Sequence, residues 1–357
     1  MRMEKHLHLL FWLIWLVACD RNQPKPDDTF DKEAMLSNYS NEVVLPAYEN
    51  ADAATSKLND VAAGFVNQPD ASKLTSLRNA LNQAYLAWVI AETYELGPAA
   101  SANLRLTVNT FPVDSTQVMK NIEAGSWDLF AAQNSDARGL PALDLLLNAF
   151  PDDTLLVWMQ ARPSVGAYIM DNISLVVESV GGVISEWKSG YGKEFETNTA
   201  SDVGSPIGTL VNQINYEFEL LKNARIGIPM GKKTLGEPRI ASLEAYYADY
   251  SKELAMANCR GIADAFTGGQ GSGLDDYLDD LGAKYGNRSL SDAIKMGFEE
   301  IINELSNIDG SLSEAIKRDP GELEAVYSAI ERQVVLLKTD MPSQLGVQIT
   351  YQDNDGD

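Results

Sequence analysis

Apolar residues recur at three- and four-residue steps along most of this chain. The clearest stretches are 74–91, 169–187, 207–221 and 323–337. This spacing places the apolar side chains on one face of a helix. Because such helices stabilise themselves by packing their apolar faces together, the pattern predicts an all-α fold built from helical bundles.

Helix boundary signals support this interpretation. Asp70 has the residue type of an N-cap, and Gly97-Pro98 is typical of a helix end. Pro163 and Pro206 suit the first turn of a helix, and 319–322 resembles a capping box. Further helices are expected near 35–60, 139–149, 238–266, 274–283 and 289–307.

Evidence for strands is minimal. Only 347–351 alternates between apolar and polar residues, so one short strand is expected there. The segment 190–206 is rich in Gly, Ser, Thr and Asn and predicts a long loop. The glycine-rich segment 268–273 lacks the lysine of a phosphate-binding loop and is interpreted as a linker between helices.

The N-terminus has the layout of a lipoprotein signal peptide. Arg2 and Lys5 precede an apolar run at 9–18, which is shorter than the ~20 residues of a membrane-spanning helix. The run ends in Leu16-Val-Ala-Cys19, which resembles a bacterial lipobox. We therefore expect a signal peptide at 1–18, a lipidated Cys19, a flexible tether at 19–33 and a helical domain at 34–357. The expected location is the cell envelope, on the periplasmic or surface face of the outer membrane, with the membrane as a partner through the lipid anchor.

Composition excludes several kinds of chemistry. The formal charge of -23 makes nucleic acid an unsuitable partner, and it is typical of a solvated acidic surface. The only histidines, His6 and His8, lie within the expected signal peptide. The remaining chain therefore lacks Ser-His-Asp and Cys-His catalytic arrangements and the usual zinc ligands. Cys259, the other cysteine besides Cys19, is expected to be buried and inert.

Carboxylates and tyrosines are the metal ligands that remain. Tyr246 and Tyr250 would share a face of the helix expected at 238–266, with Asp249 beside them. Such oxygen ligands suit iron or calcium, although the same spacing is typical of packed core aromatics. The acidic end 353–357 resembles the start of a calcium loop but lacks the distal glutamate, so a frayed tail is the simpler interpretation.

Several segments together resemble the imelysin-like family over about 33–357. They are Tyr85-Leu-Ala-Trp88, Glu95-Leu-Gly-Pro98, Asn103 to Asn109 with Phe111-Pro112, 139–147, Arg225-Ile-Gly-Ile-Pro229 and 345–357. The resemblance implies two packed four-helix bundles, with a split expected near 150–165. It also implies an envelope protein associated with iron regulation or uptake, in a family named for a proposed metallopeptidase.

The family signature is Gly-x-His-x-x-Glu on a helix, proposed to bind a metal. The corresponding residues here are Gly139, Pro141 and Asp144. Proline supplies no donor atom, and one carboxylate is too few ligands for a closed site, so the signature is degenerate. Pro141 instead suits the first turn of a helix. The cofactor is therefore unknown: Asp144, Tyr246 and Tyr250 are candidates for iron or calcium, and nothing indicates zinc.

A pocket is expected where the two bundles meet, near Asp144. Its candidate residues are Trp88, Arg105, Asn109 and Arg225. Buried arginines usually pair with carboxylates. The partner is either a carboxylate of this chain or a carboxylate of a ligand.

We thus expect a non-enzymatic binding or accessory lipoprotein that serves iron or other nutrient uptake. An outer-membrane receptor or another envelope protein would be its partner. Two alternatives are a divergent metallopeptidase and a scaffold that docks a partner protein through its acidic surface.

Overall fold

A computed structural model describes residues 30–350 of the chain. The expected signal peptide, Cys19, the tether as far as residue 29 and the acidic end at 353–357 lie outside the described residues. Within the described part, helix α1 begins at Lys32, directly after Asp31, whose side chain accepts a hydrogen bond from the Ala34 N–H. Helix α1 thus begins slightly before the expected domain boundary at residue 34.

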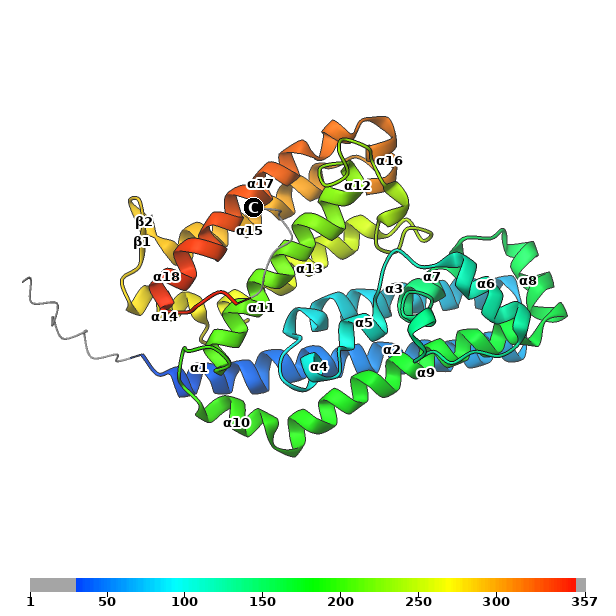
Figure 1. Cartoon of the computed structure of the whole chain (residues 1–357), viewed down its shortest axis with the longest axis horizontal. Helices are drawn as coiled ribbons and strands as arrows, with labels where there is room; N and C mark the ends of the chain where they lie inside the picture. Colours follow the sequence, from blue (N-terminus) through cyan, green and yellow to red (C-terminus); the bar gives the residue numbers. More distant parts are fainter. Residues whose placement is uncertain (1–29, 351–357) are drawn as a thin grey trace, which may run out of the picture. The chain divides into compact units, whose positions relative to one another are not determined.

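Two four-helix bundles form the described part of the chain, which confirms the all-α prediction. In the first bundle, α2, α3, α7 and α9 pack together through buried apolar faces. Figure 1 shows this bundle in blue to green. Its elements are α1 (Lys32–Asn38), η1 (Tyr39–Val44), α2 (Leu45–Asn67), α3 (Ala71–Ala91), η2 (Glu92–Tyr94), α4 (Pro98–Ser101), α5 (Leu104–Val108), α6 (Ser115–Ala124), η3 (Ala132–Asn134), α7 (Gly139–Asn148), α8 (Asp152–Ala161), α9 (Pro163–Glu186), η4 (Trp187–Tyr191) and α10 (Gly192–Thr197).

The second bundle packs α11, α13, α15 and α17 together. Its elements are α11 (Pro206–Leu220), η5 (Leu221–Gly227), α12 (Ile228–Met230), η6 (Ile240–Ser242), α13 (Ser251–Thr267), α14 (Leu274–Asp280), β1 (Lys284–Tyr285), β2 (Arg288–Ser289), α15 (Leu290–Asn307), α16 (Leu312–Arg318), η7 (Pro320–Leu323), α17 (Glu324–Val335), η8 (Leu336–Asp340) and α18 (Met341–Leu345). The elements η1, η4, η5 and η8 are π-helical turns that continue directly from, or into, α-helices.

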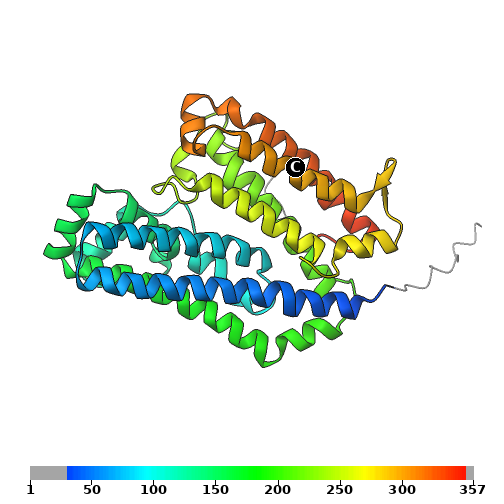
Figure 2. The same cartoon turned by 180° about the vertical axis from the view of Figure 1, so that it is seen from behind.

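Helices α3 and α13 pack against each other and join the two bundles. Figure 2 shows α13 in yellow beside α3 in light blue. The chain passes from one bundle to the other at 198–205, later than the split expected near 150–165. The reason is that α9 packs on α2 and α7, so it belongs to the first bundle.

Most of the predicted helix starts are confirmed. The Asp70 carboxylate accepts a hydrogen bond of 2.8 Å from the Lys73 N–H, and the Ser205 hydroxyl accepts one from the Gly208 N–H. Pro163 and Pro206 each occupy the first position of their helix. At Asp319 the expected capping box does not form: the Asp319 carboxylate accepts a hydrogen bond from the Gly321 N–H, and the Glu322 carboxylate pairs with Arg318.

Two predicted helix and loop segments differ in the structure, whereas a third is as expected. The helix expected at 238–266 begins only at Ser251, because left-handed backbone at Ala245 and Asp249 breaks it. Part of the loop expected at 190–206 is helical, as α10 extends to Thr197. Residues 268–273 do link two helices, as predicted.

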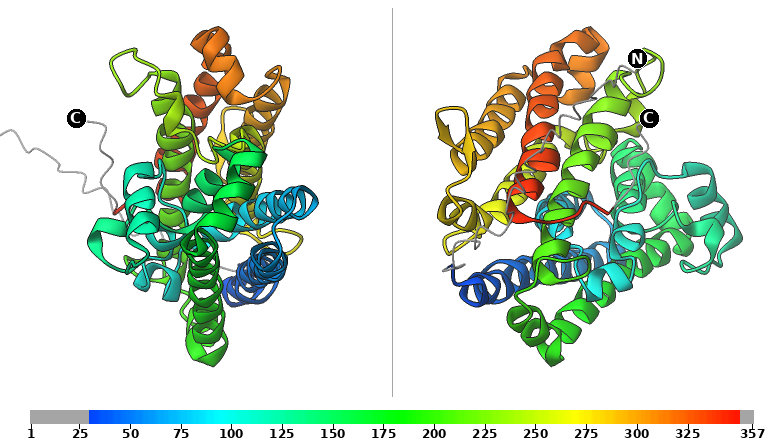
Figure 3. Two further views of the ribbon diagram at one scale, coloured as in Figure 1. Left: turned by 90° about the vertical axis from the view of Figure 1, so that its right-hand side faces the viewer. Right: turned by 60° about the vertical axis from the view of Figure 1, so that its left-hand side comes forward.

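No strand forms at 346–350. The amide group of Asn212 in α11 instead holds this segment, with its Nδ2 donating to the Gln348 carbonyl at 2.9 Å and its Oδ1 accepting from the Thr350 N–H at 2.7 Å. Figure 3 shows the segment in red, crossing α11. The strands among the described residues are β1 and β2, which are two residues long each and pair in an antiparallel hairpin.

The helical stretch Pro163–Thr197 is long and apolar enough to cross a membrane by length and composition. Core helices share these properties. Here the apolar face of α9, including Ile169, Ile173 and Val176, is buried against α2 and α7.

Candidate functional site

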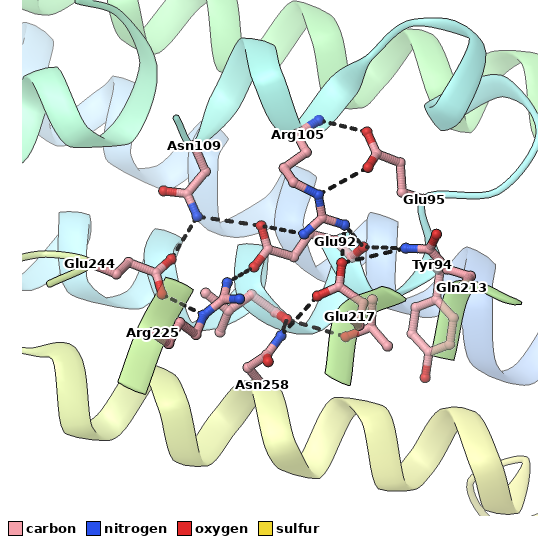
Figure 4. Close-up of polar contacts among 12 residues, drawn as sticks. Glu92, Tyr94, Glu95, Arg105, Asn109, Gln213, Glu217, Arg225, Glu244 and Asn258 are labelled. Carbon is pink, nitrogen blue, oxygen red and sulfur yellow. Dashed lines mark hydrogen bonds and ion pairs between the residues drawn. The ribbon is translucent and has the colours of Figure 1, made fainter. Parts of the chain in front are cut away.

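Five charged side chains lie buried where the two bundles meet. Glu92 and Arg105 come from η2 and α5 of the first bundle, whereas Glu217, Arg225 and Glu244 come from the second. Their exposed fractions range from 0% for Glu217 to 9% for Arg105. Figure 4 shows them converging, and we call these five residues the charged network.

Arg105 links three carboxylates. Its backbone N–H and its Nε donate to the two carboxylate oxygens of Glu95, at 2.9 and 3.0 Å. Its Nη2 pairs with Glu217 and also donates to the Glu92 carbonyl at 3.0 Å. The Glu92 carboxylate lies 3.8 Å from Nη1. One short helix turn thereby fixes a guanidinium against both bundles.

Arg225 joins two carboxylates and shares one of them, Glu92, with Arg105. Its Nε donates to Glu244 at 2.8 Å, and its Nη2 pairs with Glu92. Asn109 bridges the same two carboxylates, donating to Glu244 at 2.6 Å and to Glu92 at 3.4 Å. Arg225 lies in the π-helical turn η5, and such turns shift the side chains after them relative to a regular helix.

The network contains more buried carboxylates than guanidinium groups. Burial raises the pKa of Glu217 to about 7, against the opposing effect of Arg105. Burial also raises the pKa of Glu244, although Arg225 opposes it. For Arg105 burial lowers the pKa, but Glu217, Glu92 and Glu95 outweigh it, so the net shift is upward. The arginines therefore stay charged, and Glu217 titrates near neutral pH.

A cavity of about 170 Å³ opens onto this network. Its wall includes Glu92, Arg105, Asn109, Tyr216 and Arg225. Two buried polar atoms in the wall have no hydrogen-bond partner among residues 30–350, namely Nη1 of Arg105 and Oδ1 of Asn109. Buried polar atoms are normally paired, because an unpaired one costs about 1–3 kcal/mol. Arg105 and Asn109 line the cavity, although these two atoms themselves are inaccessible to solvent.

Asp144, at the glutamate position of the degenerate signature, has a different role. Its oxygens accept hydrogen bonds from the backbone N–H groups of Tyr247 and Ala248, at 3.0 and 2.8 Å, and from Asn148 at 3.1 Å. Burial nevertheless raises the pKa of Asp144 to about 6. Asp144 fixes the irregular segment that carries Glu244, and so it positions the charged network without joining it.

The metal implied by the family does not fit these residues. Pro141 lies in the first turn of α7, as expected, and offers no ligand atom. The lone pairs of Asp144 already accept three hydrogen bonds. No group of three or more His, Cys, Asp or Glu side chains within residues 30–350 is arranged to hold a metal ion.

Gly139, the signature glycine, has a steric role. Its φ of +73° lies in the left-handed region, and a Cβ there would lie 2.2 Å from the Val108 carbonyl oxygen. Its N–H donates to Asn172 at 2.8 Å. The absence of a side chain thus allows α7 to begin directly against α5, the turn that carries Arg105.

The other predicted site residues have mixed outcomes. Arg105, Asn109 and Arg225 do lie together at the bundle junction. Trp88 does not line their cavity, because its ring is fully buried in the first bundle. Tyr246 lines a separate hollow of about 20 Å³ with Asp144, whereas Tyr250 does not. The two tyrosines precede α13, so the shared helix face expected for them does not exist.

Cys259 is buried in α13, as expected. Burial raises the pKa of its thiol to about 12. Since the thiolate is the reactive form, this thiol is inert at neutral pH.

Sequence reasoning missed Glu92 and Glu217, which connect the network. A signal for both was present. Glu217 follows Ile214 by three residues and precedes Leu221 by four, and Glu92 follows Tyr85 by seven. Both carboxylates therefore occupy core positions of an apolar stripe, and a charged residue in such a position must find a buried partner.

Comparisons with known proteins agree with this architecture. The family model described as Imelysin, a peptidase family by its label, matches residues 44–337. A stretch of 121 residues is 28% identical to iron-regulated protein A of Synechococcus elongatus, covering 34% of this chain and only 33% of that protein.

Two crystal structures share the fold. An imelysin-like protein from Psychrobacter arcticum has a TM-score of 0.72 at 19% identity, covering 90% of this chain and 97% of its own. A protein described as an iron-regulated protein A precursor from Parabacteroides distasonis has a TM-score of 0.73 at 15% identity, covering 91% and 97%.

Proposed function

The chain belongs to the imelysin family, and on that premise we propose that it is a non-enzymatic binding or accessory protein for iron or other nutrient uptake. The observation that carries the proposal is the junction cavity of about 170 Å³. Arg105 and Asn109 line it, and each carries a buried polar atom without a hydrogen-bond partner among residues 30–350. A small polar molecule that both donates and accepts hydrogen bonds would satisfy them.

The link to iron comes from relatives. Two similar proteins are named as iron-regulated, one from Synechococcus elongatus and one from Parabacteroides distasonis. The ligand set around Asp144 does not suit an ion held by protein atoms alone. We therefore propose that the protein serves uptake by binding a small polar molecule, in the cell envelope and held there by a lipid on Cys19. An outer-membrane receptor or another envelope protein would be the partner.

A variant that fills the cavity tests this proposal. Ala224 lines the cavity and belongs to none of the network ion pairs. Each variant is expressed in a strain that lacks the gene, and growth on limiting iron is measured. Ala224→Phe should leave the fold intact but fail to restore growth. Ala131→Phe, at a half-buried alanine outside the cavity, should restore growth fully. Full restoration by Ala224→Phe would contradict a binding role for this cavity.

A divergent metallopeptidase is the competing function, because the matching family is labelled a peptidase family. Equilibrium dialysis of residues 20–357 against zinc and iron, with a peptidase assay, separates the two. We expect no stoichiometric metal and no cleavage that EDTA abolishes. Tight zinc binding with EDTA-sensitive cleavage would replace the binding proposal.

A scaffold that docks a partner protein through its acidic surface is the third candidate function. A pull-down from envelope extract would then recover a partner complex that dissociates at high salt.

A further inference from the structure

A second cleft lies in the second bundle, between α15 and α17 and beneath the β1–β2 hairpin. Its volume is about 450 Å³, within the range of small-molecule sites. Ala293 and Gly297 of α15 and Ala329 of α17 line it, and these small residues leave space between the two helices. None of the residues that line this cleft lines the junction cavity.

The rim of this cleft is unusually apolar for a surface. Tyr285, Met296 and Val335 all line it, with exposed fractions of 50%, 51% and 53%. Single exposed apolar side chains are ordinary, but three around one hollow indicate a site for an apolar group. Leu336 extends the apolar wall inward.

The same rim carries positive charge, although the protein is strongly acidic. Arg288 of the hairpin donates to the thioether sulfur of Met296 at 2.7 Å, and no ion pair of Arg288 is found among the described residues. A thioether is a weak acceptor, so the guanidinium retains its capacity for a carboxylate. Arg332, on the other side of the cleft, is paired with Glu300 at 2.7 Å.

Gln333 lines the cleft and has a buried amide oxygen without a hydrogen-bond partner among residues 30–350. The Gln333 side chain is 1% exposed, and its amide nitrogen donates to the Ile294 carbonyl at 2.9 Å. Its Oε1 has no donor within residues 30–350 and faces Gly297. Because Gly297 has no side chain, the amide lies against the backbone of α15 at the cleft wall.

We propose that this cleft binds a small molecule with an apolar chain, an amide N–H and a carboxylate, as in an N-acyl amino acid. The chain lies against Met296 and Val335, the N–H faces Gln333, and the carboxylate pairs with Arg288. The charge of the rim selects this anion over the corresponding neutral amide, since a guanidinium binds a carboxylate through two charge-assisted hydrogen bonds.

Calorimetric titration of residues 20–357 with N-octanoylglycine tests the proposal. We expect saturable binding that weakens at least tenfold in Arg288→Gln and at least tenfold for the uncharged probe N-octanoylglycinamide. Arg239→Gln, at an exposed arginine outside the cleft, should bind like the unmodified chain.

A second variant tests the apolar rim without disturbing the core. Val335→Glu should abolish binding, whereas Val203→Glu, at a valine that is 60% exposed elsewhere, should not. Absence of saturable binding to the unmodified chain, or equal affinity in Arg288→Gln, would overturn the proposal. Neither outcome bears on the junction cavity, since the two sites share no residue.

Discussion

Glu92 and Arg225 are 133 residues apart in the chain, yet their buried side chains form an ion pair. Glu92 ends the long helix of the first bundle, and Arg225 lies in the π-helical turn that follows α11 of the second. The pair therefore connects the bundles by charge, in addition to the apolar contact between α3 and α13.

Removing Arg225 should strongly destabilise the protein. Arg225→Leu leaves the Glu244 carboxylate buried without its cation and leaves Glu92 with Arg105 alone, and breaking such a buried pair costs about 3–5 kcal/mol. Urea unfolding followed by circular dichroism measures this loss. Arg332→Leu, which breaks an exposed pair with Glu300, should cost less than about 1 kcal/mol. Equal losses for the two variants would show that the buried network adds no stability.

Glu217 should make stability depend on pH. Its pKa is about 7 in the folded protein and near 4.5 when unfolded, so between these values the folded state binds more protons. Its contribution is therefore fully present below pH 4.5 and is lost as pH rises through 7. Raising the pH from 5 to 8 should lower the free energy of unfolding by on the order of 2 kcal/mol more in the unmodified chain than in Glu217→Gln. Parallel pH profiles for the two proteins would refute this assignment.

Asp144 should act on stability and not on metal content. Asp144→Ala leaves the N–H groups of Tyr247 and Ala248 without their acceptor, at a cost of about 1–3 kcal/mol. Asp144→Asn retains one carbonyl acceptor and should lose less. Dialysis against zinc or iron should give the same metal content for all three proteins. A drop in bound metal on either substitution would restore a ligand role for this residue.

Cys19 should hold the protein in the membrane. Cys19→Ala is expected to move the protein from the membrane fraction to the soluble fraction, because multiple acyl chains at one residue give stable anchoring. Cys259→Ala is the matched control, since this thiol is buried in α13. Immunoblots of fractionated cells give the readout. Membrane retention of Cys19→Ala would contradict lipidation.

The sequence pattern predicts the helices but not the irregular backbone that interrupts them. The stripe from Leu74 to Ala91 was readable because burial follows a 3.6-residue period, and all of its predicted members are buried. The left-handed backbone at Ala245 and Asp249 could not be predicted, because neither residue type requires that conformation. That backbone is stabilised by Asp144, about a hundred residues earlier, and local pattern carries no information about such a contact.

The sequence predicts part of the candidate site, namely its arginines and Asn109, but not the carboxylates that pair with them. Arg105, Asn109 and Arg225 were found through family segments, and the structure places them around one cavity. Their carboxylate partners were not identified, because pairing across the bundles depends on how α3 meets α11 and α13. The sequence allows Arg225 to pair either with a carboxylate of this chain or with a ligand, and in the structure it pairs with Glu92 and Glu244.

The family signature combines a glycine with two proposed metal ligands, and the conformation of Gly139 shows that the glycine has a steric role of its own. Its missing side chain lets α7 start against Val108, three residues beyond Arg105, whatever stands at positions 141 and 144. The steric requirement for glycine at this position is thus independent of any metal ligand. In this chain, Gly139 is therefore explained by the packing of α7 on α5 and by itself indicates no catalytic role.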